Sequence, residues 1–216
     1  MSENTLITAD GIVKRYGAPL FSPISFKLNA GEVLGLEGCN GSGKTTLLDI
    51  IAGLCRPDSG QIRTRGEIGY VMQRDGLSGL LSCRDNLLFE GALCRLSSSE
   101  ARSRLEALAE KCAISEFLNK RLGLCSAGMR QRVNLAAALM CKPDVLLLDE
   151  VFSALDAEAR PLVRGIIRDT LGDGAAIVLV SHDSGDLDDL CDRIISLPDA
   201  SLRETQRTAA TERRLL

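Results

Sequence analysis

Residues 38–46 read Gly38-Cys39-Asn40-Gly41-Ser42-Gly43-Lys44-Thr45-Thr46. A glycine followed after four residues by Gly-Lys-Thr is typical of a loop whose backbone amides point inward at a phosphate chain. The apolar run 33–36 before the loop indicates a buried strand, and residues 46–52 after it indicate a helix. The helix would then begin at the phosphates, where its amide dipoles favour negative charge. The stretch therefore predicts a strand, loop and helix unit that binds a nucleotide.

Lys44 and Thr45 are the side chains of this loop that suit phosphate chemistry. Lys44 is expected to reach the outer phosphates as a point charge, and the Thr45 hydroxyl to take one position on a magnesium ion. The alternative is a glycine turn with a solvated lysine. That alternative would not require a strand before the loop and a helix after it, so the nucleotide site is favoured.

The composition is that of a globular protein with an aliphatic core. Of the 216 residues, 45% are hydrophobic, 25% are charged and 3% are aromatic, and there is no tryptophan. This length suits one large domain, or a domain with a small insert. Because the hydrophobic fraction is ordinary but contains few aromatic residues, the core is expected to be aliphatic, which favours a parallel sheet covered by helices.

Charge and cysteine content exclude several classes of protein. The formal net charge of -3 lacks the basic excess that a nucleic-acid-binding surface needs, so no direct nucleic-acid partner is expected. No apolar run approaches the ~20 residues of a membrane-spanning helix. The eight cysteines are scattered, with no Cys-x-x-Cys pair that could begin a zinc site. Scattered thiols and no signal peptide favour a reducing cytosol.

Two kinds of strand are indicated along the chain. Residues 24–28 alternate between apolar and polar, which is typical of an antiparallel, half-exposed strand. From residue 31 onward the runs are continuously apolar, as in a parallel sheet buried on both faces. These runs are Val33–Leu36, Ile68–Met72, Val145–Leu148, Ile177–Val180 and Ile194–Leu197. The predicted fold class is α/β, with a mostly parallel core sheet and an antiparallel N-terminal β subdomain.

Residues 76–124 show no strand pattern and are predicted to form a helical subdomain inserted in a single domain over 1–216. Apolar residues recur there at helical spacing behind the cap-rich segment 97–100. Residues 199–216 read as a mixed, polar tail with weak helical character. We therefore expect one domain with one insert and one tail.

Asp149 and Glu150 follow the buried run 145–148, at the edge where a doubly wound sheet presents its ligand crevice. Asp149 is suited to hold the magnesium ion directly or through water, and Glu150 is suited to accept a proton from an attacking water. The alternative is an Asp-Glu pair that caps the next helix. The phosphate loop earlier in the chain favours the catalytic interpretation.

A series of motifs follows along the chain after the phosphate loop. They are Gln73 at the end of the run 68–72, Ser126-Ala127-Gly128-Met129-Arg130-Gln131-Arg132, Asp149-Glu150, Ser153-Ala154-Leu155-Asp156 and His182. In this order they resemble the ATP-binding subunit of ABC transporters, over about residues 5–200. The resemblance implies a P-loop NTPase fold of the ABC ATPase type, with ATP and Mg²⁺ as cofactors.

The resemblance also implies a role for each matching position. Tyr16 would stack on adenine, with surface packing as the alternative for a lone tyrosine. The loop residues that would bind the nucleotide are Gly38, Cys39, Asn40, Gly41, Ser42, Gly43, Lys44, Thr45 and Thr46. The catalytic residues would be Lys44, Gln73, Glu150 and His182. The magnesium ion would be held by Thr45, Gln73 and Asp149.

Ser126 and Gly128 match the family signature, which in a head-to-tail dimer closes on the γ-phosphate bound by the other copy. Asp156 would close the loop between the two sites. The signature usually reads Leu-Ser-Gly-Gly-Gln, whereas this chain has Cys125-Ser126-Ala127-Gly128-Met129. Ala127 would carry a penalty if its position needed a positive φ. Cys39 and Cys125 of opposite chains are expected to cross-link under mild oxidation.

The implied function is that of an ATP-hydrolysing subunit on the cytoplasmic face of the cell membrane. It would pair with a second ABC ATPase subunit, identical or different, and energise separate transmembrane permease subunits. Its signature and the stretch 81–87 resemble exporters more than importers, and the segment 76–95 would receive a helix of the permease. The alternative is a soluble ABC-type ATPase acting on DNA or ribosomes, whose coiled coils, zinc modules or doubled cassettes this sequence lacks. A small-molecule kinase would need neither the signature nor the segment 153–156.

Overall fold

The computed structural model describes residues 4–73 and 76–205 and centres on a six-stranded sheet. The strand order is β11-β10-β5-β9-β8-β7. The parallel strands are β5 (Val33–Gly38), β7 (Ile68–Val71), β8 (Val145–Asp149), β9 (Ala176–Val180) and β10 (Arg193–Leu197). They coincide with the continuous apolar runs, so the predicted mostly parallel core is confirmed.

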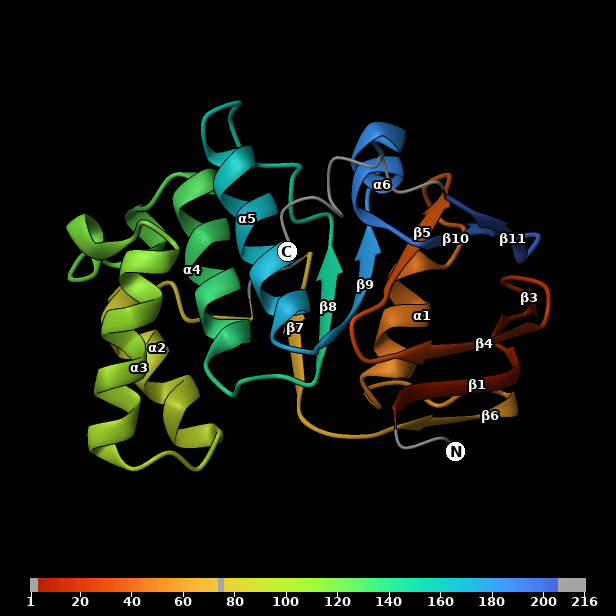
Figure 1. The fold of residues 1–216 in the computed structure, drawn as a ribbon, viewed down its shortest axis with the longest axis horizontal. Coiled ribbons are helices and arrows are strands. Elements are labelled where there is room, and N and C mark those ends of the chain that lie inside the picture. The colour runs from red at the N-terminus through yellow and green to blue at the C-terminus, as the bar shows by residue number, and fades with distance from the viewer. Residues whose placement is uncertain (1–3, 74–75, 206–216) are drawn as a thin grey trace.

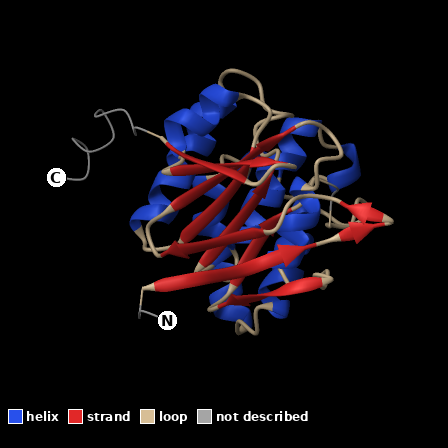
Figure 2. Ribbon diagram, turned by 90° about the vertical axis from the view of Figure 1, so that its right-hand side faces the viewer, coloured by secondary structure: helices blue, strands red, loops and turns tan. Residues whose placement is uncertain are grey.

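A second, antiparallel sheet forms the N-terminal part. Its strand order is β4 (Ile24–Asn29), β1 (Thr5–Val13) and β6 (Ser59–Thr64), and a small hairpin joins β2 (Arg15–Tyr16) to β3 (Ala18–Pro19). Residues 24–28 alternate between buried and exposed, as their pattern predicted. Figure 2 shows the strands of both sheets together, with helices behind them.

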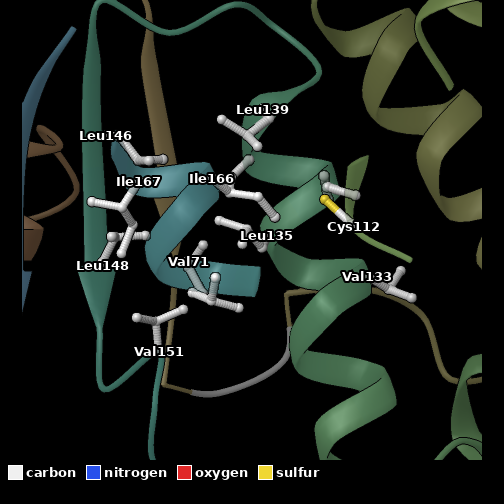
Figure 3. Packing of buried hydrophobic residues seen from close by; sticks show 14 of the residues in the cluster. Val71, Cys112, Val133, Leu135, Leu139, Leu146, Leu148, Val151, Ile166 and Ile167 are labelled. Atoms are coloured by element: carbon white, nitrogen blue, oxygen red, sulfur yellow. The ribbon is translucent and has the colours of Figure 1, made fainter. Parts of the chain in front are cut away.

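Helix α1 (Lys44–Ile51) lies between the two sheets (Figure 1). Its buried residues join a cluster that contains Val145 and Leu147 of β8 together with the inner face of the antiparallel sheet. Leu146 and Leu148 point the other way, into the cluster formed with α4 (Ala127–Leu139) and α5 (Ala159–Gly172). Figure 3 shows this second cluster from close by. Alternate residues of one strand thus bury both faces of the core sheet.

Residues 76–124 form helices and contribute no strand to either sheet, as predicted. They contain α2 (Cys83–Leu93), α3 (Ser98–Lys111), η1 (Ser115–Phe117) and η2 (Leu122–Leu124), which lie with α4 at one end of the molecule (Figure 1). Helix α3 begins with a capping box, in which the Ser97 side chain and the Glu100 side chain each bond the other residue's backbone amide. The exact subdomain boundaries stay a prediction.

One disulfide, between Cys94 and Cys141, joins the end of α2 to the residue after the C-cap of α4. The interpretation of the cysteines as scattered thiols is therefore wrong for this pair. The two residues are 47 positions apart in sequence, with Cα atoms 5.3 Å apart. Helix packing brings them together, and their spacing in the sequence gives no sign of it.

The start of the predicted tail is a strand rather than weak helix. Strand β11 (Ser201–Glu204) pairs antiparallel with β10 at the edge of the core sheet. All four residues are exposed, so no apolar pattern marks the strand. Residues 206–216 of the predicted tail lie outside the described residues. Within the described part of the chain, no helix has the length and apolar character needed to cross a bilayer.

Candidate functional site

The loop after β5 is shaped by its glycines. Gly43 has a φ of 100° and precedes α1 without any side-chain cap, so the first amides of the helix are left open for a ligand. Gly38 has a φ of 147°, and a Cβ there would lie 2.6 Å from the carbonyl oxygen of Leu197. Larger residues at either position would strain the loop or displace its neighbours.

Lys44 folds back over this loop. Its Nζ donates to the carbonyl oxygens of Gly38 at 2.7 Å and Cys39 at 3.1 Å, and the residue is buried. The ammonium is thus held at the inner side of the loop, beside the open amides. A cation and free amides at one place form a site for phosphate.

Thr45 and Asp149 provide a pair of oxygen donors beside the loop. The Thr45 hydroxyl donates to Oδ2 of Asp149 at 2.7 Å, which ties the first turn of α1 to the end of β8. Burial raises the pKa of Asp149, while the Thr45 hydrogen bond and the charge of Lys44 partly oppose this. Among the described residues there is no cluster of three or more metal-binding side chains. A hydroxyl and one carboxylate suit Mg²⁺, which keeps waters and takes phosphate oxygens as further ligands.

Glu150 and His182 lie side by side although they come from different loops. Oε1 of Glu150 is 3.1 Å from Nε2 of His182, which is within ion-pair distance. No hydrogen bond to this Glu150 oxygen is formed by the described residues. The Glu150 backbone has a φ of 55°, unusual for a residue with a side chain, and its amide donates to the Val180 carbonyl. Burial raises the pKa of Glu150, opposed by His182 and reinforced by Asp149. A buried carboxylate with spare acceptor capacity can take a proton from water.

These groups open into one cavity of about 320 Å³. Its lining comes from the β2–β3 hairpin, the phosphate loop, the end of β7, the end of β8 and the loop after β9. The lining residues are Tyr16, Leu20, Asn40, Gly41, Gly43, Lys44, Thr45, Thr46, Gln73, Asp149, Glu150 and His182. The structure thus gathers the predicted residues of five separate segments. Gly38, Cys39 and Ser42 belong to the loop but do not line the cavity.

The family described as ABC transporter matches residues 21–153. The chain belongs to the ABC transporter family. The chain is an ATPase of that family.

Several curated relatives cover most of this ABC chain. Nod factor export ATP-binding protein I of Azorhizobium caulinodans is 33% identical, over 94% of this chain and 68% of that protein. Daunorubicin resistance ATP-binding protein DrrA3 of Streptomyces coeruleorubidus is 35% identical, over 95% of this chain and 69% of that protein. Linearmycin resistance ATP-binding protein LnrL of Bacillus subtilis is 33% identical, over 88% of this chain and 65% of that protein. The chain spans about two thirds of the length of these relatives.

Solved structures share the ABC ATPase fold. An ATP-binding subunit of an ABC transporter matches with a TM-score of 0.85 and 24% identity, over 98% of this chain and 93% of that chain. A dimeric bacterial ABC transporter cassette matches with a TM-score of 0.85 and 24% identity, over 93% and 99%. The predicted fold class is confirmed.

The signature residues of this ABC chain do not line the cavity. Ser126 is exposed and caps α4, accepting a hydrogen bond from the Met129 amide at 3.2 Å. Ala127 is the first residue of that helix and has no positive φ, so the expected penalty does not arise. A Cβ on Gly128 would lie 3.1 Å from the Ala154 carbonyl oxygen, which places the signature beside the segment 153–156.

Cys125 does not have the exposure that cross-linking would require. Its side chain is buried, with Sγ 3.7 Å from Sγ of Cys83, whereas Cys39 is exposed. The structure therefore contradicts the predicted Cys39–Cys125 cross-link in the folded chain. Sequence position placed Cys125 in the signature but could not show which way its side chain points.

Sequence reasoning missed a set of ion-paired side chains that do not line the cavity. Helix α5 carries arginines at 160, 164 and 168, and the segment after His182 carries aspartates at 183, 186 and 189. The structure pairs these two series. The spacing of four in one and three in the other would place each series on one face of a helix, a signal that could have found them. Leu20, which also lines the cavity, has no such signal.

Proposed function

We propose that this ABC ATPase is the ATP-hydrolysing subunit of an exporter whose membrane-spanning part is a separate chain. The observation that carries the proposal is the single cavity that brings Lys44, Thr45, Asp149, Glu150 and His182 together. Relatives named for Nod factor export and for drug resistance support the direction of transport. The chain would lie on the cytoplasmic face of the membrane, held there by its permease.

Each cavity residue has a role that its position suits. Lys44 and the open amides of α1 bind and neutralise the outer phosphates, and Tyr16, which is exposed at the rim, stacks on the base. Glu150 orients the attacking water and takes its proton, with His182 3.1 Å away to hold the water and the γ-phosphate. Gln73 contacts the magnesium ion or the water from the end of β7.

Magnesium fits the donors at this place. Thr45, Asp149 and Gln73 would hold the ion, leaving its other positions to water and phosphate oxygens. When bound, Mg²⁺ neutralises charge that builds on the transferred phosphoryl group. The buried Asp149 carboxylate, whose pKa burial raises, would gain a counter-charge there.

A second copy of an ABC subunit would complete the site. Within one chain Ser126 is exposed and outside the cavity, so it cannot contact the nucleotide bound there. In a head-to-tail pair the helix start at Ser126 would offer its hydroxyl and free amides to the γ-phosphate in the other copy. Each chain would then supply half of two sites.

Size-exclusion chromatography with light scattering tests this pairing. The Glu150→Gln variant should form a dimer with ATP, and adding Ser126→Arg should return it to monomer because a bulky cation fills the interface. Ser97→Arg, which removes the cap of α3 at another exposed serine, is the matched control and should leave the dimer intact. An ATP-dependent dimer that persists with Ser126→Arg would contradict the head-to-tail arrangement.

The insert offers an apolar surface to a membrane partner. Leu80, Leu81, Phe89, Leu93 and Leu124 are all exposed large hydrophobic residues of the segment 76–124. A cavity of about 270 Å³ lies nearby, between the end of β7, α2 and α4. Exposed apolar residues grouped on one part of a chain indicate a protein interface. These residues support docking of the permease on the segment that follows Gln73 in the sequence.

A further inference from the structure

Glu150 and His182 are carried by separate loops, yet their reacting atoms lie 3.1 Å apart. Helix α5 follows the first loop, and α6 (Ser184–Leu190) follows the second. Ion pairs from Arg164 to Asp186 and Asp189 join the two helices. The pairing of its arginines with aspartates connects the two loops. These pairs stand outside the cavity lining.

Asp186 is the centre of the connection. Its side chain is 0% exposed, and Oδ1 lies 2.5 Å from Nη2 of Arg164 and 3.5 Å from Nη1 of Arg160. Its other oxygen, Oδ2, accepts a hydrogen bond from the Ser181 hydroxyl at 3.3 Å. A carboxylate removed from water in this way depends on its partners, so its position is fixed by them.

The Ser181 hydroxyl also fixes the residue on the other side of His182. It accepts a hydrogen bond from the Asp183 amide at 3.1 Å. The Asp183 carboxylate lies 3.5 Å from Nη1 of Arg160 and caps α6 through the Gly185 amide. Both neighbours of His182 are therefore tied, through Asp186 and Arg160, to helix α5.

The same arginines contact the loop of Glu150. The guanidinium carbons of Arg160 and Arg164 each lie 5.8 Å from the ring centre of Phe152, which is buried two residues after Glu150. Cations at this distance from an aromatic ring are attracted to it. Arg164 also donates to Asp189 at 2.6 Å, so its planar head is held on two sides.

We infer that Arg160, Arg164 and Asp186 form a positioning network that sets the relation between Glu150 and His182. None of the three lines the cavity, so they act through the two loops and not on the nucleotide. The inference rests on the proposed roles of Glu150 and His182 in hydrolysis. It predicts a defect in turnover with ATP binding preserved.

The test is a double-mutant cycle between Arg164 and His182, with single-turnover phosphate release and ATP affinity both measured. Arg164→Lys keeps the charge but loses the planar head that holds Asp186, Asp189 and Phe152 together. We expect it to slow phosphate release about 10–100-fold, since small misplacements of catalytic groups have effects of that order. The dissociation constant for ATP should stay within about twofold, and in the His182→Ala background the same change should cost nothing further.

Arg168→Lys is the matched control, because this arginine lies on the same helix and pairs with Asp189 alone. It should release phosphate at the parental rate. If Arg164→Lys does not fold, Arg160→Lys, whose ion pairs are both 3.5 Å long, enters the same cycle. An equal loss in the presence and absence of His182, or a loss of ATP affinity alone, would overturn the network. A parental rate for His182→Ala would refute the proposed role of His182 itself and the network with it.

Discussion

At the scale of single residues, Glu150 combines a left-handed backbone with a buried carboxylate whose pKa is raised. Such a combination is costly to the fold and is found where a site needs it. Its place after the run 145–148 could be predicted from the sequence because strand ends in α/β sheets form ligand crevices. Its contact with His182 could not, since the two are 32 residues apart in the printed sequence.

Glu150→Gln should slow ATP hydrolysis by on the order of 10²-fold or more, because the amide cannot take a proton from water. ATP binding, measured with a fluorescent analogue, should be unchanged. The pKa of this carboxyl is higher in the folded state than in the unfolded chain. The free energy of unfolding therefore falls as the pH rises through the folded-state pKa, because the buried group must then ionise. The variant should therefore melt no lower than the parent at neutral pH without nucleotide. Parental hydrolysis in this variant would refute Glu150 as the base.

At the scale of elements, strands with long apolar runs could be predicted from the sequence. Strands without such runs were missed. The parallel strands are buried on both faces, so their patterns are continuous. Strands β6 and β11 are largely exposed, and neither was predicted. The disulfide between Cys94 and Cys141 was also missed, because it depends on how α2 packs against α4.

The packing of α4 on β7 can be tested by a substitution at Gly69. A Cβ on Gly69 would lie 2.2 Å from the Ala138 carbonyl oxygen, so Gly69→Ala forces strand and helix apart. We expect a loss of about 1–3 kcal/mol, measured by thermal unfolding. Gly165→Ala is the control, since Gly165 lies in α5 with nothing within 4 Å of an added Cβ. It should gain about 0.5–1 kcal/mol. Equal stability of both variants would contradict the close packing of α4 on β7.

At the scale of the whole molecule, two features point outward from the chain. The signature residue Ser126 is exposed and does not line the cavity of its own chain, and exposed apolar side chains occur on the insert. The sequence predicted both partners through its resemblance to ABC subunits. Which apolar residues are exposed became known only from the packing, because burial cannot be read from a helical pattern that is polar on most sides.

Affinity capture of a tagged copy from detergent-solubilised membranes of the native host tests most directly whether this ABC ATPase serves a transporter. The parent should recover a multi-spanning protein in stoichiometric amount, and Leu93→Ser, on the insert, should lose it. Leu54→Ser is the matched control, since the two leucines are similarly exposed, at 63% for Leu54 and 62% for Leu93. It should recover the same partner as the parent. Recovery of the parent only from the soluble fraction, with ribosomal or DNA-associated proteins, would contradict the transport function.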